Sequence, residues 1–204
     1  MFSNSVNLNP PRGIVVTTVA TDPSTGPGIA TFYDMNGRNP VVLYDYYQTV
    51  TGYPTGAVYD GNNGVIIAVD GTDMIQRIDL LTLVVSTFSS SSSITAAPLR
   101  QITRSTADGS VYIVESSTAT IEKLDSLGQR TGNPFISTTT GSCVLATPYG
   151  ITYIPTTQYI AVISMAAAGK LQIYDKNGTC ISQVTAAPFA TGTPTGIAYH
   201  APSN

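Results

Sequence analysis

One unit recurs along this chain and constrains its fold more than any other feature. Each copy opens with a proline and an apolar, strand-like run, and in each copy an aspartate precedes a later turn. The openings, 44, 50 and 46 residues apart, are Pro54-Thr55-Gly56, Pro98-Leu99-Arg100, Pro148-Tyr149-Gly150 and Pro194-Thr195-Gly196. The aspartates are Asp34, Asp79, Asp125 and Asp175. Such a period, built only of strand-like segments, predicts an all-β fold, a small β-propeller with one four-stranded blade per repeat.

The repeat that begins at Pro54 shows the blade pattern most clearly. Val, Ile, Thr and Tyr fill its strands, and Gly, Asn and Asp fill its turns. Its four predicted strands are Gly56–Tyr59, Val65–Val69, Ile75–Ile78 and Leu83–Phe88. We therefore predict one domain, 1–204, with blades at about 13–53, 54–97, 98–147 and 148–193.

The first repeat lacks its opening strand. Its segments Ile14–Val19, Ile29–Tyr33 and Val41–Tyr44 match second, third and fourth strands. Residues 21–27 contain two prolines and a glycine and cannot form the missing strand. Gly196–Tyr199 matches a first strand without a following blade, so we predict that 194–200 closes the first blade and completes a four-bladed ring. The alternative is an open wedge of a six- or seven-bladed ring.

The hairpin Phe32-Tyr33-Asp34-Met35-Asn36-Gly37 aligns with Ile173-Tyr174-Asp175-Lys176-Asn177-Gly178. Together with the Pro-x-Gly openings, this pattern resembles the NHL and YncE-like bacterial propellers from Gly13 to Tyr199. The resemblance implies a propeller fold that recognises its ligands through its surface, and it implies no particular activity.

Composition excludes several classes of function. Charged residues make up 10% of the chain and the net charge is −3, so no basic surface is expected and nucleic-acid binding is not predicted. No continuously apolar run approaches a membrane span of about 18 residues, and we predict no membrane insertion. The first residues lack the basic segment and the apolar segment after it that are typical of a signal peptide. The Ser/Thr-rich, Lys-poor composition favours an extracellular or cell-surface domain.

Few residues could carry catalysis. The chain has one histidine, His200, and no tryptophan, which excludes multi-histidine zinc sites. The fold resembles lactonases of the SMP-30 type, which implies a divalent metal held by oxygen ligands. Candidate carboxylates follow predicted second strands, where they could equally cap turns: Asp22, Asp70, Asp73 and Glu115. We predict no metal and no cofactor.

The two cysteines, Cys143 and Cys180, match no metal or redox spacing. The strand pattern places Cys143 in a loop at the far end of the blade from Cys180. We therefore expect two separate buried thiols rather than a disulfide.

Departures from the repeat indicate the candidate binding surface. Arg100 replaces the glycine of the other openings, and Tyr149 replaces a Thr or Leu. An arginine with aromatic neighbours at a concave mouth suits a carboxylate, a sugar or a peptide side chain. The candidate ligand-binding residues are Arg100, Tyr149, Tyr53, Glu115 and Asp70.

These observations favour a non-enzymatic recognition or adhesion module that binds a glycan or protein surface, within a larger surface or fibre protein. The alternatives are a metal-dependent hydrolase of the lactonase type and a structural wedge that closes a ring with other copies. A homo-oligomer is compatible with each hypothesis.

Overall fold

The computed structural model describes most of the chain and leaves the connections between several strands out. The described residues are 13–18, 29–34, 36–45, 52–71, 74–89, 98–132, 134–137, 143–165, 169–185 and 194–200. Among them no helix is long and apolar enough to cross a membrane.

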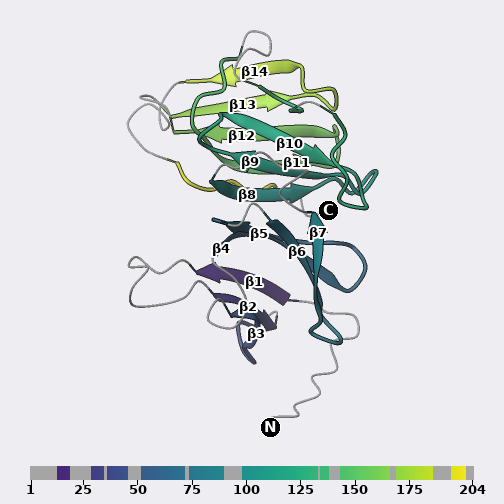
Figure 1. The fold of residues 1–204 in the computed structure, drawn as a ribbon. Helices are drawn as coiled ribbons and strands as arrows, with labels where there is room; N and C mark the ends of the chain where they lie inside the picture. Colours follow the sequence, from purple (N-terminus) through teal and green to yellow (C-terminus); the bar gives the residue numbers. More distant parts are fainter. Residues whose placement is uncertain are drawn as a thin grey trace.

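The fold is all-β, with four antiparallel sheets that correspond to four successive blades (Figure 1). Blades two and four have four strands, and blades one and three have three. The strands are β1 (Gly13–Thr18), β2 (Ile29–Asp34) and β3 (Val41–Asp45); β4 (Tyr53–Tyr59), β5 (Gly64–Asp70), β6 (Met74–Asp79) and β7 (Val85–Ser89); β8 (Leu99–Arg104), β9 (Val111–Glu115) and β10 (Thr120–Leu124); and β11 (Pro148–Ile154), β12 (Tyr159–Ser164), β13 (Lys170–Tyr174) and β14 (Cys180–Val184).

Blade three has only a rudimentary outer strand. The sequence predicts a fourth strand near Arg130–Ile136, but the chain there forms two isolated bridges, Leu124 with Arg130 and Ile121 with Ile136. Pro134 and Gly132 lie between the bridges, and proline has no N–H for the ladder.

Apolar side chains on both faces of the central strands form the cores between blades. In β5, Val65, Ile67 and Val69 pack toward blade one, whereas Ile66 and Ala68 pack toward blade three. Because both faces of this strand are covered, it is apolar without alternation. A third cluster, which includes Tyr153 and Tyr174, joins blades three and four.

The four repeated aspartates organise the turns that the sequence predicts. Asp175 Oδ1 accepts hydrogen bonds from the backbone N–H groups of Asn177 and Thr179, at 2.9 and 2.8 Å. Asp34, Asp79 and Asp125 accept equivalent bonds from their own turns. The turn that follows each aspartate in the sequence is thus present, and the aspartate side chain binds its backbone.

Two expectations from the sequence are wrong. Cys143 and Cys180 form a disulfide, with Cα atoms 5.8 Å apart. The segment that contains Cys143 does not stay at the far end of the blade but lies against blade four, where Gln172 donates from Nε2 to the carbonyl of Val144.

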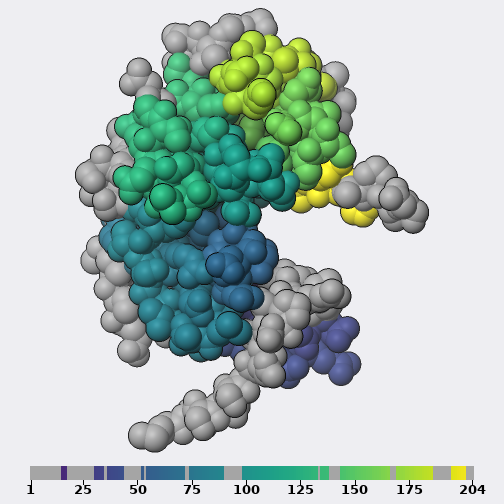
Figure 2. Space-filling view, turned by 90° about the vertical axis from the view of Figure 1, so that its right-hand side faces the viewer, coloured from purple at the N-terminus to yellow at the C-terminus, as the bar shows by residue number. Residues whose placement is uncertain are grey.

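The closure expected from the sequence is also not formed among the described residues. Within the described part of the chain, β1 pairs with β2 alone, and 194–200 contains no strand. Instead, Gln101 Nε2 donates to the carbonyl of Ile197, and the Tyr199 N–H donates to Thr152 Oγ1. These bonds hold the segment beside β8 and β11. Figure 2 shows that the blades follow an arc whose two ends face each other across an opening.

Candidate functional site

A cavity of about 430 Å³ lies among the inner strands of the arc. Its walls come from β1, β4, β8, β11 and the segment 194–200, so every blade contributes to it. The lining residues are Val15, Thr17, Thr55, Gly56, Ala57, Arg100, Gln101, Tyr149, Thr195 and Gly196. Arg100 is the only charged residue in this lining.

The glycine of the Pro54-Thr55-Gly56 opening has a physical reason at this cavity. A Cβ on Gly56 would lie 2.9 Å from the Arg100 carbonyl oxygen and 3.0 Å from the Ile102 nitrogen. Glycine therefore lets β4 approach β8 closely. Thr55 Oγ1 uses this proximity to donate a hydrogen bond to the Arg100 carbonyl, at 3.2 Å.

The Arg100 side chain is positioned by three neighbours. Its Nε donates to Ser116 Oγ at 3.3 Å, and its Nη1 lies 3.5 Å from Asp70 Oδ2. The guanidinium carbon lies 5.3 Å from the centre of the Tyr149 ring, a cation–π distance. The Arg100 and Asp70 side chains remain 29% and 22% exposed, so the guanidinium can still meet a ligand from the cavity.

Three of the five predicted ligand-binding residues therefore come together: Arg100, Tyr149 and Asp70. The backbone of Tyr53 pairs with Asp70, but its side chain lies outside the described part of the structure. Glu115 is not among the lining residues and is fully buried between blades.

Glu115 lies in an unusual environment for a carboxylate. Its Oε2 accepts hydrogen bonds from the hydroxyls of Thr118 and Thr120, whereas Oε1 is buried without a hydrogen-bond partner among the described residues. Burial, with the nearby Glu122 carboxylate, raises the pKa of Glu115. Glu122 is also fully buried, and burial raises its pKa although Arg130 binds both of its oxygens.

Two residues that the sequence analysis did not select also shape the cavity. Gln101 joins three elements, because its Oε1 accepts from the Ile151 N–H and its Nε2 donates to the Ile197 carbonyl. Thr55 bridges β4 and β8. The sequence signal that could have identified these two residues is their position at the repeated openings: Thr55 lies within one, and Gln101 directly follows another.

The proposed carboxylate set for a metal cannot be assembled from the described residues. Asp22 and Asp73 lie outside them. Within the described part of the chain, no group of three or more His, Cys, Asp or Glu side chains is arranged to bind a metal ion.

Comparisons with known proteins show the fold. No family model matches the sequence, and no curated protein matches it. Solved structures match at 13–16% identity. A chain of a nidogen/laminin complex has a TM-score of 0.62, and the match covers 84% of this chain and 62% of that chain. A catalytically inactive virginiamycin B lyase from Staphylococcus aureus with quinupristin has a TM-score of 0.63, with 89% of this chain and 58% of that chain covered, and the calcium-binding protein regucalcin from Agrobacterium tumefaciens has a TM-score of 0.60, with 90% and 62% covered.

The similar structures are β-propellers, so the chain has a propeller fold. This chain spans less than two thirds of the length of each of them. At such low sequence identity the likeness concerns the fold alone.

Proposed function

We propose that the chain is a non-enzymatic recognition module that binds a protein or glycan surface through its central cavity. The observation that carries the proposal is the Arg100 guanidinium, stacked against Tyr149 and partly exposed in a cavity without another charged lining residue. Such a guanidinium can bind a carboxylate of a partner in bidentate geometry.

One further observation supports an extracellular setting for this activity, and another supports a protein as the partner. The Cys143–Cys180 disulfide is stable in oxidising compartments and rare in the cytosol. One of the similar structures is a chain of a nidogen/laminin complex, which by its name is an assembly of proteins.

The test is to apply the labelled chain to a glycan array and to an array of extracellular protein domains. We expect bound partners whose signal falls for Arg100→Gln and for Tyr149→Ala. Arg38→Gln is the matched control, because Arg38 is exposed and lies in a turn of blade one. Signals that are insensitive to both cavity variants would contradict the proposal. Stoichiometric divalent metal together with lactone hydrolysis would favour the hydrolase instead.

A second candidate, the structural wedge, is favoured by the position of Gly196–Tyr199. Gln101 accepts from the N–H of Ile151 and donates to the carbonyl of Ile197. It therefore joins the segment to β8 of blade three, much as it joins β11 to β8. Gly196–Tyr199 occupies the place of an inner strand after β11, while β1 lacks a partner on its inner edge among the described residues.

A further inference from the structure

A second cavity, of about 580 Å³, lies between blades two and three at the ends of the strands opposite Asp70 and Glu115. Turns of both blades line it. The lining residues that matter here are Asp60, Arg77, Asp79, Phe88, Arg104 and Ser126. None of them belongs to the central cavity.

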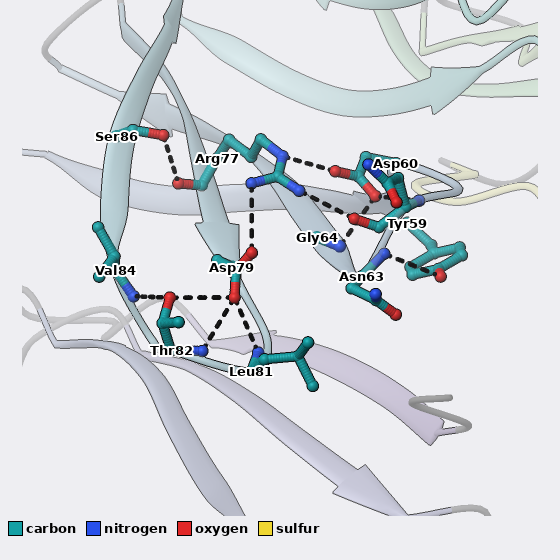
Figure 3. Close-up of polar contacts among 11 residues, drawn as sticks. Tyr59, Asp60, Asn63, Gly64, Arg77, Asp79, Leu81, Thr82, Val84 and Ser86 are labelled. Atoms are coloured by element: carbon teal, nitrogen blue, oxygen red, sulfur yellow. Dashed lines mark hydrogen bonds and ion pairs between the residues drawn. The ribbon is translucent and has the colours of Figure 1, made fainter. Parts of the chain in front are cut away.

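Arg77 organises one wall of this cavity (Figure 3). Its Nε donates to Asp60 Oδ2 at 2.6 Å, and its Nη1 lies 3.7 Å from Asp79 Oδ2. Its Nη2 also donates to the Asn62 carbonyl at 3.0 Å. Both carboxylates thus lie beside the same guanidinium, and Asp60 and Asp79 are further bound by backbone N–H groups of their turns.

Arg104 differs from the other partly buried arginines. Arg77, Arg100 and Arg130 each pair with a carboxylate. Among the described residues, the Arg104 guanidinium has neither an ion pair nor a hydrogen bond. A partly buried guanidinium has five N–H donors to satisfy, so its isolation in a cavity indicates a place for an anionic acceptor.

Two glycine turns make room for this guanidinium. A Cβ on Gly61 would lie 2.9 Å from Arg104 Nη1, and a Cβ on Gly109 would lie 3.0 Å from Arg104 Nη2. Gly61 belongs to the β4–β5 turn and Gly109 to the β8–β9 turn. The guanidinium therefore fits between the turns of two blades.

The charges and donors around Arg104 select the class of ligand. Arg104 supplies one unneutralised positive charge, whereas Asp60 and Asp79 would repel a multiply charged phosphate. Ser126 and the free lone pairs of the carboxylates offer both donors and acceptors, which hydroxyl groups need. Phe88 adds an apolar surface. We propose that this second cavity binds the carboxylate of an acidic sugar unit, with Arg104 as the bidentate partner.

The test uses a fluorescently labelled tetramer of galacturonic acid and its methyl ester, measured by fluorescence polarisation with the full chain. We expect saturable binding of the acid, binding that weakens with added NaCl, and loss of binding for the neutral ester. Arg104→Gln should weaken binding by about ten- to a hundredfold. Arg104→Lys, which keeps the charge but lacks the planar fork, should restore only part of the affinity.

Two further variants, Ser126→Asp and Arg38→Gln, guard against misfolding and against binding elsewhere on the chain. Ser126→Asp places a carboxylate next to the guanidinium, because Ser126 and Arg104 flank Gly109, and should block binding by internal competition. Arg38→Gln should bind as the parent chain does, because Arg38 is exposed and lines neither cavity.

Equal affinity for acid and ester, binding that depends on Arg100 and not on Arg104, or the absence of saturable binding would each overturn the proposal. Arg104-dependent binding of a poly-glutamate peptide, without binding of the sugar, would overturn the ligand class.

Discussion

Glu115 is the residue whose environment departs most from what its chemistry favours. Both it and Glu122 are fully buried between blades, yet only Glu122 has an arginine bound to its carboxylate. Burial raises the pKa of Glu115. The folded state therefore retains this proton to a higher pH than the unfolded state does, and the stability linked to it is present at low pH and is lost as the pH rises through the folded-state pKa.

The substitution Glu115→Gln removes the loss of stability that ionisation of the buried carboxyl group causes at high pH. We expect it to raise the free energy of unfolding at pH 8 by about 1 kcal/mol, because no charge is left beside the unpartnered Oε1 position. It should also flatten the fall in stability between acidic and basic pH. Urea unfolding at several pH values measures both effects. Glu122→Gln is the matched control and should destabilise the chain, since it breaks the pair with Arg130; equal effects of the two variants would contradict this account.

The repeated aspartates give a second prediction at the residue scale. Asp175→Ala should lower the free energy of unfolding by about 1 kcal/mol, because two backbone N–H groups lose their acceptor. Asp175 lines neither cavity, so binding to any partner found on the arrays should be unchanged. Loss of binding at full stability would show that the turn has a direct role in recognition.

At the scale of elements, the disulfide joins the segment before β11 to the outer strand β14. The link closes a loop with a sequence separation of 37 residues, for which chain entropy gives a stabilisation of roughly 3–4 kcal/mol. The double variant Cys143→Ala, Cys180→Ala should lose about this much and become insensitive to reducing agent. Thermal unfolding with and without dithiothreitol measures both. A parent chain that is equally stable when reduced would contradict the expectation.

Most elements could be predicted from the sequence, because strand residues and Gly, Asn and Asp turns alternate regularly within each repeat. The three-stranded sheet that the described residues of blade one form was also predictable, because the prolines at 23 and 27 exclude a strand between Ile14–Val19 and Ile29–Tyr33. The disulfide was not, because it depends on where a connecting segment packs after it leaves its strand. The proposed Arg104 site gave no signal either: its evidence is a guanidinium with no ion pair or hydrogen bond among the described residues, which only the three-dimensional arrangement of two turns reveals.

At the scale of the whole molecule, the open arc presents the edge of a sheet and a strand-like segment that belongs to no sheet. The edge is β1, whose only paired neighbour among the described residues is β2. The strand-like segment is Gly196–Tyr199, bonded through Ile197 O and Tyr199 N to side chains of blades three and four. If the segment of one copy pairs with β1 of another, the contact is head-to-tail and a ring closes when the rotation permits. Two chains of four blades would give eight, within the range of known propellers.

The wedge hypothesis therefore predicts a concentration-dependent dimer, measurable by light scattering after size exclusion. Ala198→Pro should abolish it, because proline has no N–H for a new ladder, while the bonds of Ile197 O and Tyr199 N within the chain can remain. Ala198→Thr, which favours an extended strand, is the control and should leave the dimer intact. A chain that stays monomeric into the millimolar range, or a dimer that tolerates the proline, would rule out closure through this strand and leave the arc as a binding surface in its own right.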